Sequence, residues 1–217
     1  MFRYTALVIP FVLSSCGIID DINDALELED RAQELEEIVD KADEVQEVLD
    51  GGEVDNIAVL TEETVDLRTG TTTYEGFAGW SIPDGSDDIV LTADAEIEAN
   101  FDDDTVTTEF TRWLGARIDS GGSATGGFGD YDATGDVAFT NGTFNTNGGD
   151  FSFVGDVEGE LEWRGDDYGI DGTVEGSIAL VDGVENIAAG AESDTVYTIN
   201  GEEVEGAEFG FGGEVVE

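Results

Sequence analysis

The spacing of hydrophobic residues changes near residue 52 and divides the chain into two parts. Over residues 25–49 apolar residues recur three and four positions apart, which is the spacing of one face of an α-helix. Asp and Glu fill most positions between them, and Gly51-Gly52 is a typical helix stop. The pattern predicts an acidic helical stalk ahead of a separate domain. The apolar series is Ala25, Leu28, Ala32, Leu35, Val39, Ala42 and Leu49.

Beyond the two glycines, apolar and polar residues alternate instead, as they do in half-buried β-strands. The longest example is the stretch 89–101, whose odd-numbered positions are all apolar and whose polar residues stand at even positions. The acidic run 102–104 would turn the chain, and residues 105–114 would form the next strand of a hairpin. The same alternation returns at 151–163 and 168–180.

Residues 155–161 and 172–178 form a small internal repeat, and each copy carries two glycines on its apolar parity. Glycine weakens a strand, so glycines on an inner face indicate sharp bending or close packing. Closing a sheet into a barrel needs such bends, and turn signals divide the region into roughly eight to ten strands. We therefore predict an all-β fold for residues 53–217, an antiparallel soluble β-barrel of about eight strands. A sandwich is the alternative.

The first sixteen residues have the layout of a secretory signal peptide. Arg3 supplies the basic start, and residues 5–13 are an apolar run too short to span a bilayer. The following Leu13-Ser14-Ser15-Cys16 resembles the lipobox of bacterial lipoproteins. The resemblance implies a signal peptide over residues 1–15, cleavage between Ser15 and Cys16, and acylation of the cysteine thiol. The alternative is an ordinary signal peptide that contains a cysteine.

Acylation of Cys16 would tether the mature chain to a membrane, because more than one acyl chain gives a stable anchor. Residues 16–52 would then be the lipidated N-terminus and the stalk. Gly17 stands where Asp would indicate inner-membrane retention, which favours the outer membrane, on its periplasmic side or at the cell surface. Residues 25–49 could also oligomerise as a coiled coil, but crowded like charges weaken such a helix. We favour the solvated stalk.

The charge of the chain limits its partners. Seven Lys and Arg stand against 53 Asp and Glu, for a net charge of −46. A surface so negative repels phosphates, which excludes nucleic-acid binding, and attracts cations. It also disfavours a membrane-spanning barrel, because the polar parity carries carboxylates that lipid would reject. A salty habitat is the simplest reason for such a composition.

The residue types that are missing exclude several kinds of chemistry. The chain has no histidine, and Cys16 is its one cysteine, so intrachain disulfides, Cys/His zinc sites and His-dependent triads cannot form. Acidic turns such as 102–104 could bind calcium, and a carboxylate pair could hydrolyse glycosides. Nothing singles out one cluster among so many carboxylates. We predict a protein that is not an enzyme and has no cofactor or metal site.

Two aromatic residues are candidates for a binding site. Phe128 and Tyr131 lie in the Gly- and Ser-rich stretch 119–134. Aromatic side chains on a loop can anchor a partner, although the same rings could simply cap the end of the barrel. The three tryptophans are predicted to belong to the core: Trp80, Trp113 and Trp163.

The chain ends in a Gly- and Phe-rich strand pattern, Gly206-Ala-Glu-Phe209-Gly-Phe211-Gly-Gly213. Together with the lipobox, the acidic stalk and the barrel, it resembles the surface lipoproteins of the transferrin-binding protein B and factor-H-binding protein type. The resemblance implies a lipid-anchored barrel that binds a protein or another macromolecule, and it transfers no binding residue. The alternatives are a lipocalin-like carrier of a small apolar ligand and an oligomerising structural lipoprotein. The space inside the barrel separates the first two.

Overall fold

The structure is a computed structural model that describes residues 57–118, 124–125, 131–145 and 151–216. The predicted signal peptide, the lipidation of Cys16 and the acidic stalk lie outside the described residues and stay predictions. Of the two candidate aromatic residues, Tyr131 is described and Phe128 is not.

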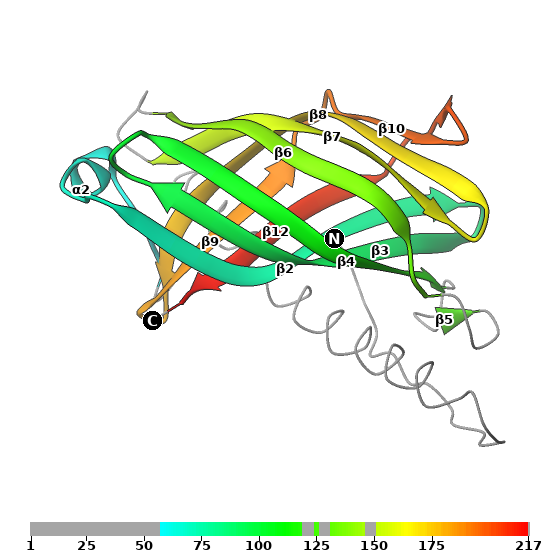
Figure 1. Ribbon diagram of the computed structural model, residues 1–217, viewed down its shortest axis with the longest axis horizontal. Coiled ribbons are helices and arrows are strands. Elements are labelled where there is room, and N and C mark those ends of the chain that lie inside the picture. Colours follow the sequence, from blue (N-terminus) through cyan, green and yellow to red (C-terminus); the bar gives the residue numbers. More distant parts are fainter. Residues whose placement is uncertain (1–56, 119–123, 126–130, 146–150, 217) are drawn as a thin grey trace, which may run out of the picture.

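Eight long strands form a closed antiparallel barrel (Figure 1). Each strand pairs with the next one in the order given below, and the last pairs with the first. The predicted all-β antiparallel barrel is therefore confirmed, and the sandwich alternative is wrong. The strands are β2 (Thr71–Asp84), β3 (Asp87–Asn100), β4 (Thr105–Ile118), β6 (Thr134–Asn145), β7 (Ser152–Trp163), β8 (Asp166–Val181), β9 (Val184–Ala191) and β12 (Glu208–Val215).

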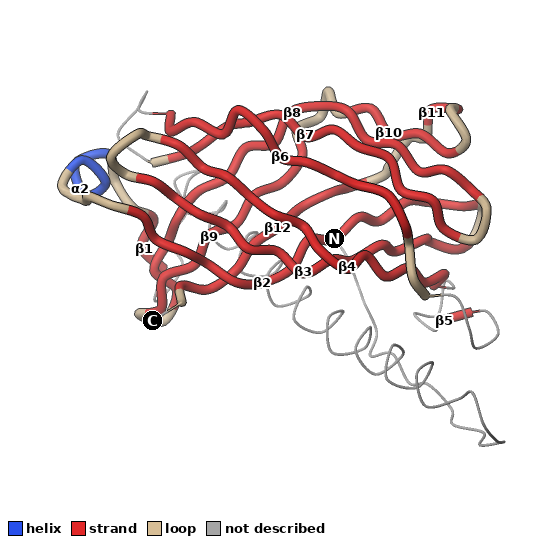
Figure 2. The backbone as a smooth tube through the Cα atoms, viewed as in Figure 1, coloured by secondary structure: helices blue, strands red, loops and turns tan. Residues whose placement is uncertain are grey.

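Short elements extend or cover the barrel (Figure 2). The strand β1 (Ile57–Val59) pairs with the end of β8, and the helix α2 (Glu62–Asp66) follows it at one end of the barrel. The hairpin of β10 (Val196–Ile199) and β11 (Glu202–Glu203) pairs with the start of β8. A two-residue strand, β5 (Ala124–Thr125), pairs with the end of β4.

The predicted alternation over 89–101 is confirmed in β3. The apolar odd-numbered side chains from Ile89 to Ala99 are at most 3% exposed, whereas Glu96 and Glu98 are exposed. The reason is the pleat of the strand, which turns successive side chains to opposite faces of the barrel wall.

A β-bulge interrupts the alternation in β4. Arg112 and Trp113 together stand opposite Ala93, and Arg112 has a positive φ of 55°. The extra residue lets both Phe110 and Trp113 face the barrel interior, where their ring centroids are 6.0 Å apart. Trp80 and Trp163 are also buried, so the prediction that the tryptophans belong to the core is confirmed.

Aromatic rings fill the middle of the barrel, which we call the lumen. Phe211 of β12 lies 5.3 Å from Phe139 of β6, between ring centroids, although these strands stand on opposite sides of the barrel. Phe211 also contacts Phe110, and Phe139 contacts Phe153, at 5.4 and 6.2 Å. These edge-to-face contacts form a continuous chain of rings from β4 through β12 and β6 to β7.

The inward glycines predicted from the repeat make room for these rings. A methyl group on Gly155 would come within 2.5 Å of the Phe139 ring, and one on Gly176 within 2.5 Å of Phe153. Real side-chain carbons do not approach so closely, so both positions require glycine. The close packing predicted for the repeated glycines is confirmed.

Candidate functional site

The lumen is the first place to look for a site, because barrels of this size can hold a small ligand. Its small inward residues, Ala93, Ala95 and Ala99, are at most 3% exposed. The chain of rings around Phe211 occupies the space that these small side chains leave. The part of the lumen that the structure describes is therefore a packed core.

A half-buried ion pair closes the lumen at the end near α2. The Arg68 guanidinium donates to both carboxylate oxygens of Glu185, at 2.7 and 2.5 Å, and the Tyr74 hydroxyl donates to the same carboxylate at 2.5 Å. Arg68 also lies over the Phe101 ring, 5.2 Å from its centroid. This bidentate geometry is the strong form of an Arg–carboxylate contact.

The pKa values of Glu185 and Tyr74, which close this end of the lumen with Arg68, lie outside their ordinary ranges. Burial alone would raise the pKa of Glu185, but the hydrogen bonds from Arg68 and Tyr74 hold it below the ordinary value. Burial, together with the bond to Glu185, raises the pKa of Tyr74 well above that of a free phenol. Glu185 is therefore ionised and fully engaged at neutral pH, which fits a closure better than a general acid or base.

The opposite end of the barrel carries a more open charged contact. Arg117 of β4 pairs with Asp84, and its guanidinium also lies 3.8 Å from Asp87. Burial, with the nearby charge of Asp166 adding to it, raises the pKa of Tyr168 at this end to about 12. About a third of the Arg117 side chain is exposed, so this contact is a weaker closure than the one at Glu185.

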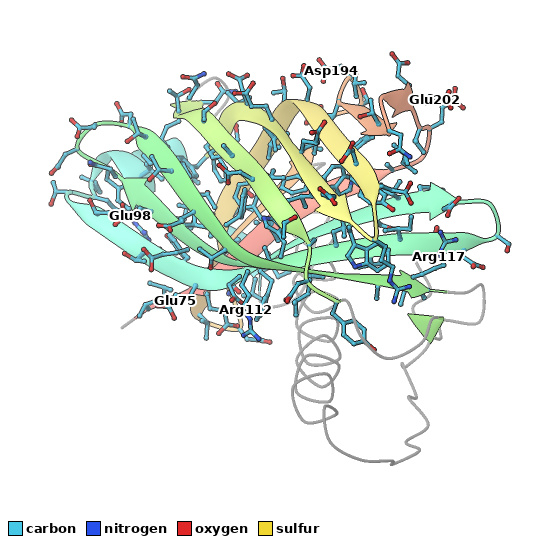
Figure 3. The ribbon with its side chains drawn as sticks, turned by 45° about the vertical axis from the view of Figure 1, so that its right-hand side comes forward. Glu75, Glu98, Arg112, Arg117, Asp194 and Glu202 are labelled. Carbon is cyan, nitrogen blue, oxygen red and sulfur yellow. The ribbon has the colours of Figure 1, made fainter. Side chains whose placement is uncertain are left out.

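The outer surface of the barrel is acidic (Figure 3). Carboxylates that face away from the lumen cover the wall formed by β6, β7 and β8, and all of them are exposed. Charges of one sign at this density raise the local concentration of cations and of basic surfaces. The carboxylates of this wall are Asp136, Asp156, Glu158, Glu160, Glu162, Asp167, Asp171 and Glu175.

On the other side of the barrel, four glutamates lie in one row across four neighbouring strands. Glu214 of β12 is opposite Glu75 of β2, which is opposite Glu96 of β3, which is opposite Glu109 of β4. Like charges directly opposite each other destabilise a sheet. Among the described residues, no three side chains of metal-ligating type come together in a way that could hold a metal ion.

An open hollow of about 550 Å³ lies over this glutamate row, on β2, β3 and β4. Phe77 and Thr111 line it beside the carboxylates, and Phe77 is half-buried. An aromatic ring among carboxylates suits a basic, partly apolar side chain of a partner. The lining residues are Glu75, Gly76, Phe77, Asp94, Ala95, Glu96, Glu109 and Thr111.

Tyr131, the described member of the predicted aromatic pair, packs on the outside of β4. Its backbone carbonyl accepts a hydrogen bond from the Gly115 amide at 2.6 Å. Its side chain packs with the outward-facing Leu114 and Ala116 and with Ile118. The structure does not bring Tyr131 into the hollow, and its role as a partner anchor stays a prediction.

No protein-family model, no curated protein and no solved structure matches the chain, so its function has to be inferred from its own structure. No helix in the described part of the chain has the length and apolar character needed to cross a membrane.

Proposed function

We propose that this protein is a lipid-anchored envelope lipoprotein whose barrel is a non-enzymatic binding module for a protein or another macromolecule. Cys16 would carry the acyl chains, and the outer surface of the barrel would bind the partner. The observation that carries the proposal is the packed lumen, where Phe211 meets Phe139 across the barrel at 5.3 Å. A carrier of small ligands needs a cavity in that place.

The charge of the outer surface favours a partner with a basic surface. The hollow over the glutamate row is the best candidate for the contact, since it combines concave shape, carboxylates and the half-buried ring of Phe77. Binding there would also relieve the repulsion among Glu75, Glu96 and Glu109, which the free protein must bear. The likeness to transferrin-binding protein B and factor-H-binding protein supports the general class and names no partner.

Site-specific crosslinking in intact cells tests the binding surface. A photoreactive residue replaces Thr111, which is exposed in the hollow, or Thr140, which is exposed on the outside of β6. We expect one discrete crosslinked species from position 111 and none from position 140. Equal labelling at both positions, or none at 111, would contradict binding through the hollow.

The anchor is tested separately with Cys16→Ser. The wild-type protein should remain with membranes after a high-salt wash, because acyl chains hold it independently of charge. The variant should be released, or accumulate as an uncleaved precursor. A wild-type protein that salt removes from the membrane would argue against lipidation.

A further inference from the structure

The pairing of β4 with β6 is interrupted partway along the barrel wall. The two strands pair up to Thr108 of β4, and contact resumes where the Trp113 carbonyl accepts a hydrogen bond from the Ala133 amide at 2.9 Å. Between these points the described residues 109–112 of β4 face residues 134–138 of β6 without a register pair between them. We call these two stretches the unpaired interval.

The backbone shows why the two strands lose their register. Arg112, the bulge residue of β4, has a φ of 55°, and Gly135 on the facing strand has a φ of 130°. A bulge bends its strand and disrupts the ladder locally. Residues 109–112 are four and residues 134–138 are five, so no single register can pair them all.

Solvent reaches the backbone in the unpaired interval. Gly135 is exposed although it shares the inward parity of Val137, and a glycine has only backbone atoms to expose. Gly142 lies in the part of β6 that pairs with Val106 of β4, and it is buried. The contrast between these two glycines of one strand indicates that solvent enters the wall where β6 lacks its β4 partner.

Two buried polar atoms border the unpaired interval. They are Oγ1 of Thr108 at one end and Nε1 of Trp113 at the other, and the part of the chain that the structure describes offers neither atom a hydrogen-bond partner. The Trp113 residue is 5% exposed. Leaving a buried donor or acceptor unpaired is costly, and in proteins such groups commonly bind ordered water.

We propose that the unpaired interval is a hydrated port through the barrel wall, where ordered water binds Thr108, Trp113 and the unpaired backbone between them. The port ends at the aromatic rings behind it. Phe110 lies 6.0 Å from Trp113, between ring centroids, and both Phe110 and Phe139 contact Phe211, so the middle of the lumen stays packed. The proposal does not depend on the partner-binding function above.

The chemistry of the port favours water over other occupants. The indole of Trp113 can only donate a hydrogen bond, whereas the hydroxyl of Thr108 can donate or accept, and water matches both. A cation cannot accept from an indole N–H. The exposed carboxylates of Glu109 and Asp136 stand in the interval and would repel an anion.

Trp80 provides a comparison within the same barrel. Its Nε1 also has no partner among the described residues, and the residue is 0% exposed. Unlike Trp113, it lies where its strand is paired on both sides, with Phe209 of β12 and Leu91 of β3. No interruption of the ladder leads to Trp80, so the port predicts different solvent access for the two indoles.

Hydrogen exchange at the indole N–H groups, followed by NMR on the full purified chain, tests the port. We expect the Trp113 indole to exchange at least about tenfold faster than the Trp80 indole. Global unfolding exposes both indoles together, so only a local route to solvent separates their rates. Equal exchange rates at the two indoles would overturn the proposal.

A variant that covers the port locates the route. Ala138 is a half-buried outward residue in the interval, and Ala138→Leu should slow exchange at Trp113 by at least about fivefold. The matched control, Ala188→Leu, adds the same volume at a half-buried outward alanine of β9 and should leave the rate unchanged. Unchanged exchange at Trp113 in Ala138→Leu would overturn the port as the route.

A direct measurement covers the case in which Ala138→Leu does not fold. Magnetisation transfer from water to the Trp113 indole proton, recorded on the unsubstituted chain, should give a cross-peak from bound water. The absence of this cross-peak would overturn the proposal. A cross-peak from a small organic molecule in its place would also overturn it, in favour of a ligand site.

Discussion

The lumen and the outer surface of the barrel are built from alternate residues of the same strands, and their chemistry is opposite. In β3 the inward Leu91 and Ile97 are fully buried among apolar groups, whereas the outward Glu96 and Glu98 are exposed. In the part of the barrel that the structure describes, aromatic rings in contact with one another pack the lumen. On the outer surface the carboxylates of the glutamate row repel one another, and a bound partner could relieve this repulsion. The comparison teaches that alternate residues of one strand can build a packed core on one face and a highly charged surface on the other.

The largest expected effect comes from opening the lumen. Phe211→Ala removes a ring that contacts Phe110 and Phe139, and it should lower the free energy of unfolding by about 3–5 kcal/mol. The outward Glu158→Ala is the control and should change stability by less than about 0.5 kcal/mol. Urea denaturation measures both. Similar losses of unfolding free energy in the two variants would contradict the difference in stability between the lumen and the outer surface.

The closure at Glu185 should have the next largest effect. Glu185→Gln removes the charge that Arg68 and Tyr74 share, and it should cost about 1–3 kcal/mol because Arg68 loses its bidentate partner. Glu162→Gln on the outer wall is the control, with no measurable loss expected. A neutral Glu185→Gln would show that the closure does not hold this end of the barrel.

Acid titration sharpens this prediction. The pKa of Glu185 in the folded protein lies below its ordinary value of 4.5. Its contribution to stability is therefore complete above pH 4.5 and is lost as the pH falls through the folded pKa. Unfolding curves of the wild type should show this loss, and Glu185→Gln should lack that part of the slope. Identical slopes in the two proteins would contradict the ion pair.

Alkaline titration probes the lumen through its tyrosines. Burial raises the pKa values of Tyr168 and Tyr197 from 10.0 to about 12, and that of Tyr74 further. The stabilising contribution of such a group is complete below pH 10 and is lost as the pH rises through the folded pKa. Absorbance should show these phenols ionising later in the folded than in the unfolded protein. Ionisation at the ordinary pKa would mean that water enters the lumen.

The smallest effect is expected on the outer surface. Glu96 lies between Glu75 and Glu109, whereas Glu98, two residues away, lies between Thr73 and Thr107. Glu96→Gln should therefore stabilise the protein by about 0.5 kcal/mol more than Glu98→Gln, and the difference should shrink in high salt. Thermal unfolding at two salt concentrations measures it. If the two substitutions changed stability equally at low salt, this would contradict repulsion within the glutamate row.

Much of the lumen was predictable from the sequence, because strand alternation reports which residues share a face. The odd positions of 89–101 and the inward glycines at 155, 159, 172 and 176 follow from parity alone. The alternation of apolar and polar residues cannot show which residues of a strand face inward where both faces of the strand are apolar. At the end of β8, Ser177, Ala179 and Val181 are buried although they face outward beside inward apolar residues, so alternation does not distinguish the two faces there.

The hollow over the glutamate row could not be predicted, because its position depends on information that a single sequence does not carry. The glutamate row depends on the register of four strands, and a shift by one residue would break it. The bulge at Arg112 likewise changes which residues of β4 face inward, and nothing in the sequence 105–114 signals it. The ion pair of Arg68 with Glu185 joins residues 117 positions apart, which only the closed topology brings together.

Native mass spectrometry of the protein extracted from its own membrane tests the central claim most directly. We predict a chain that begins at Cys16 with covalent acyl groups, and whose mass is the same before and after denaturation because nothing is bound in the lumen. A chain that begins at Met1 without acyl groups would contradict the anchor. A small apolar molecule that is lost on denaturation would contradict the packed lumen.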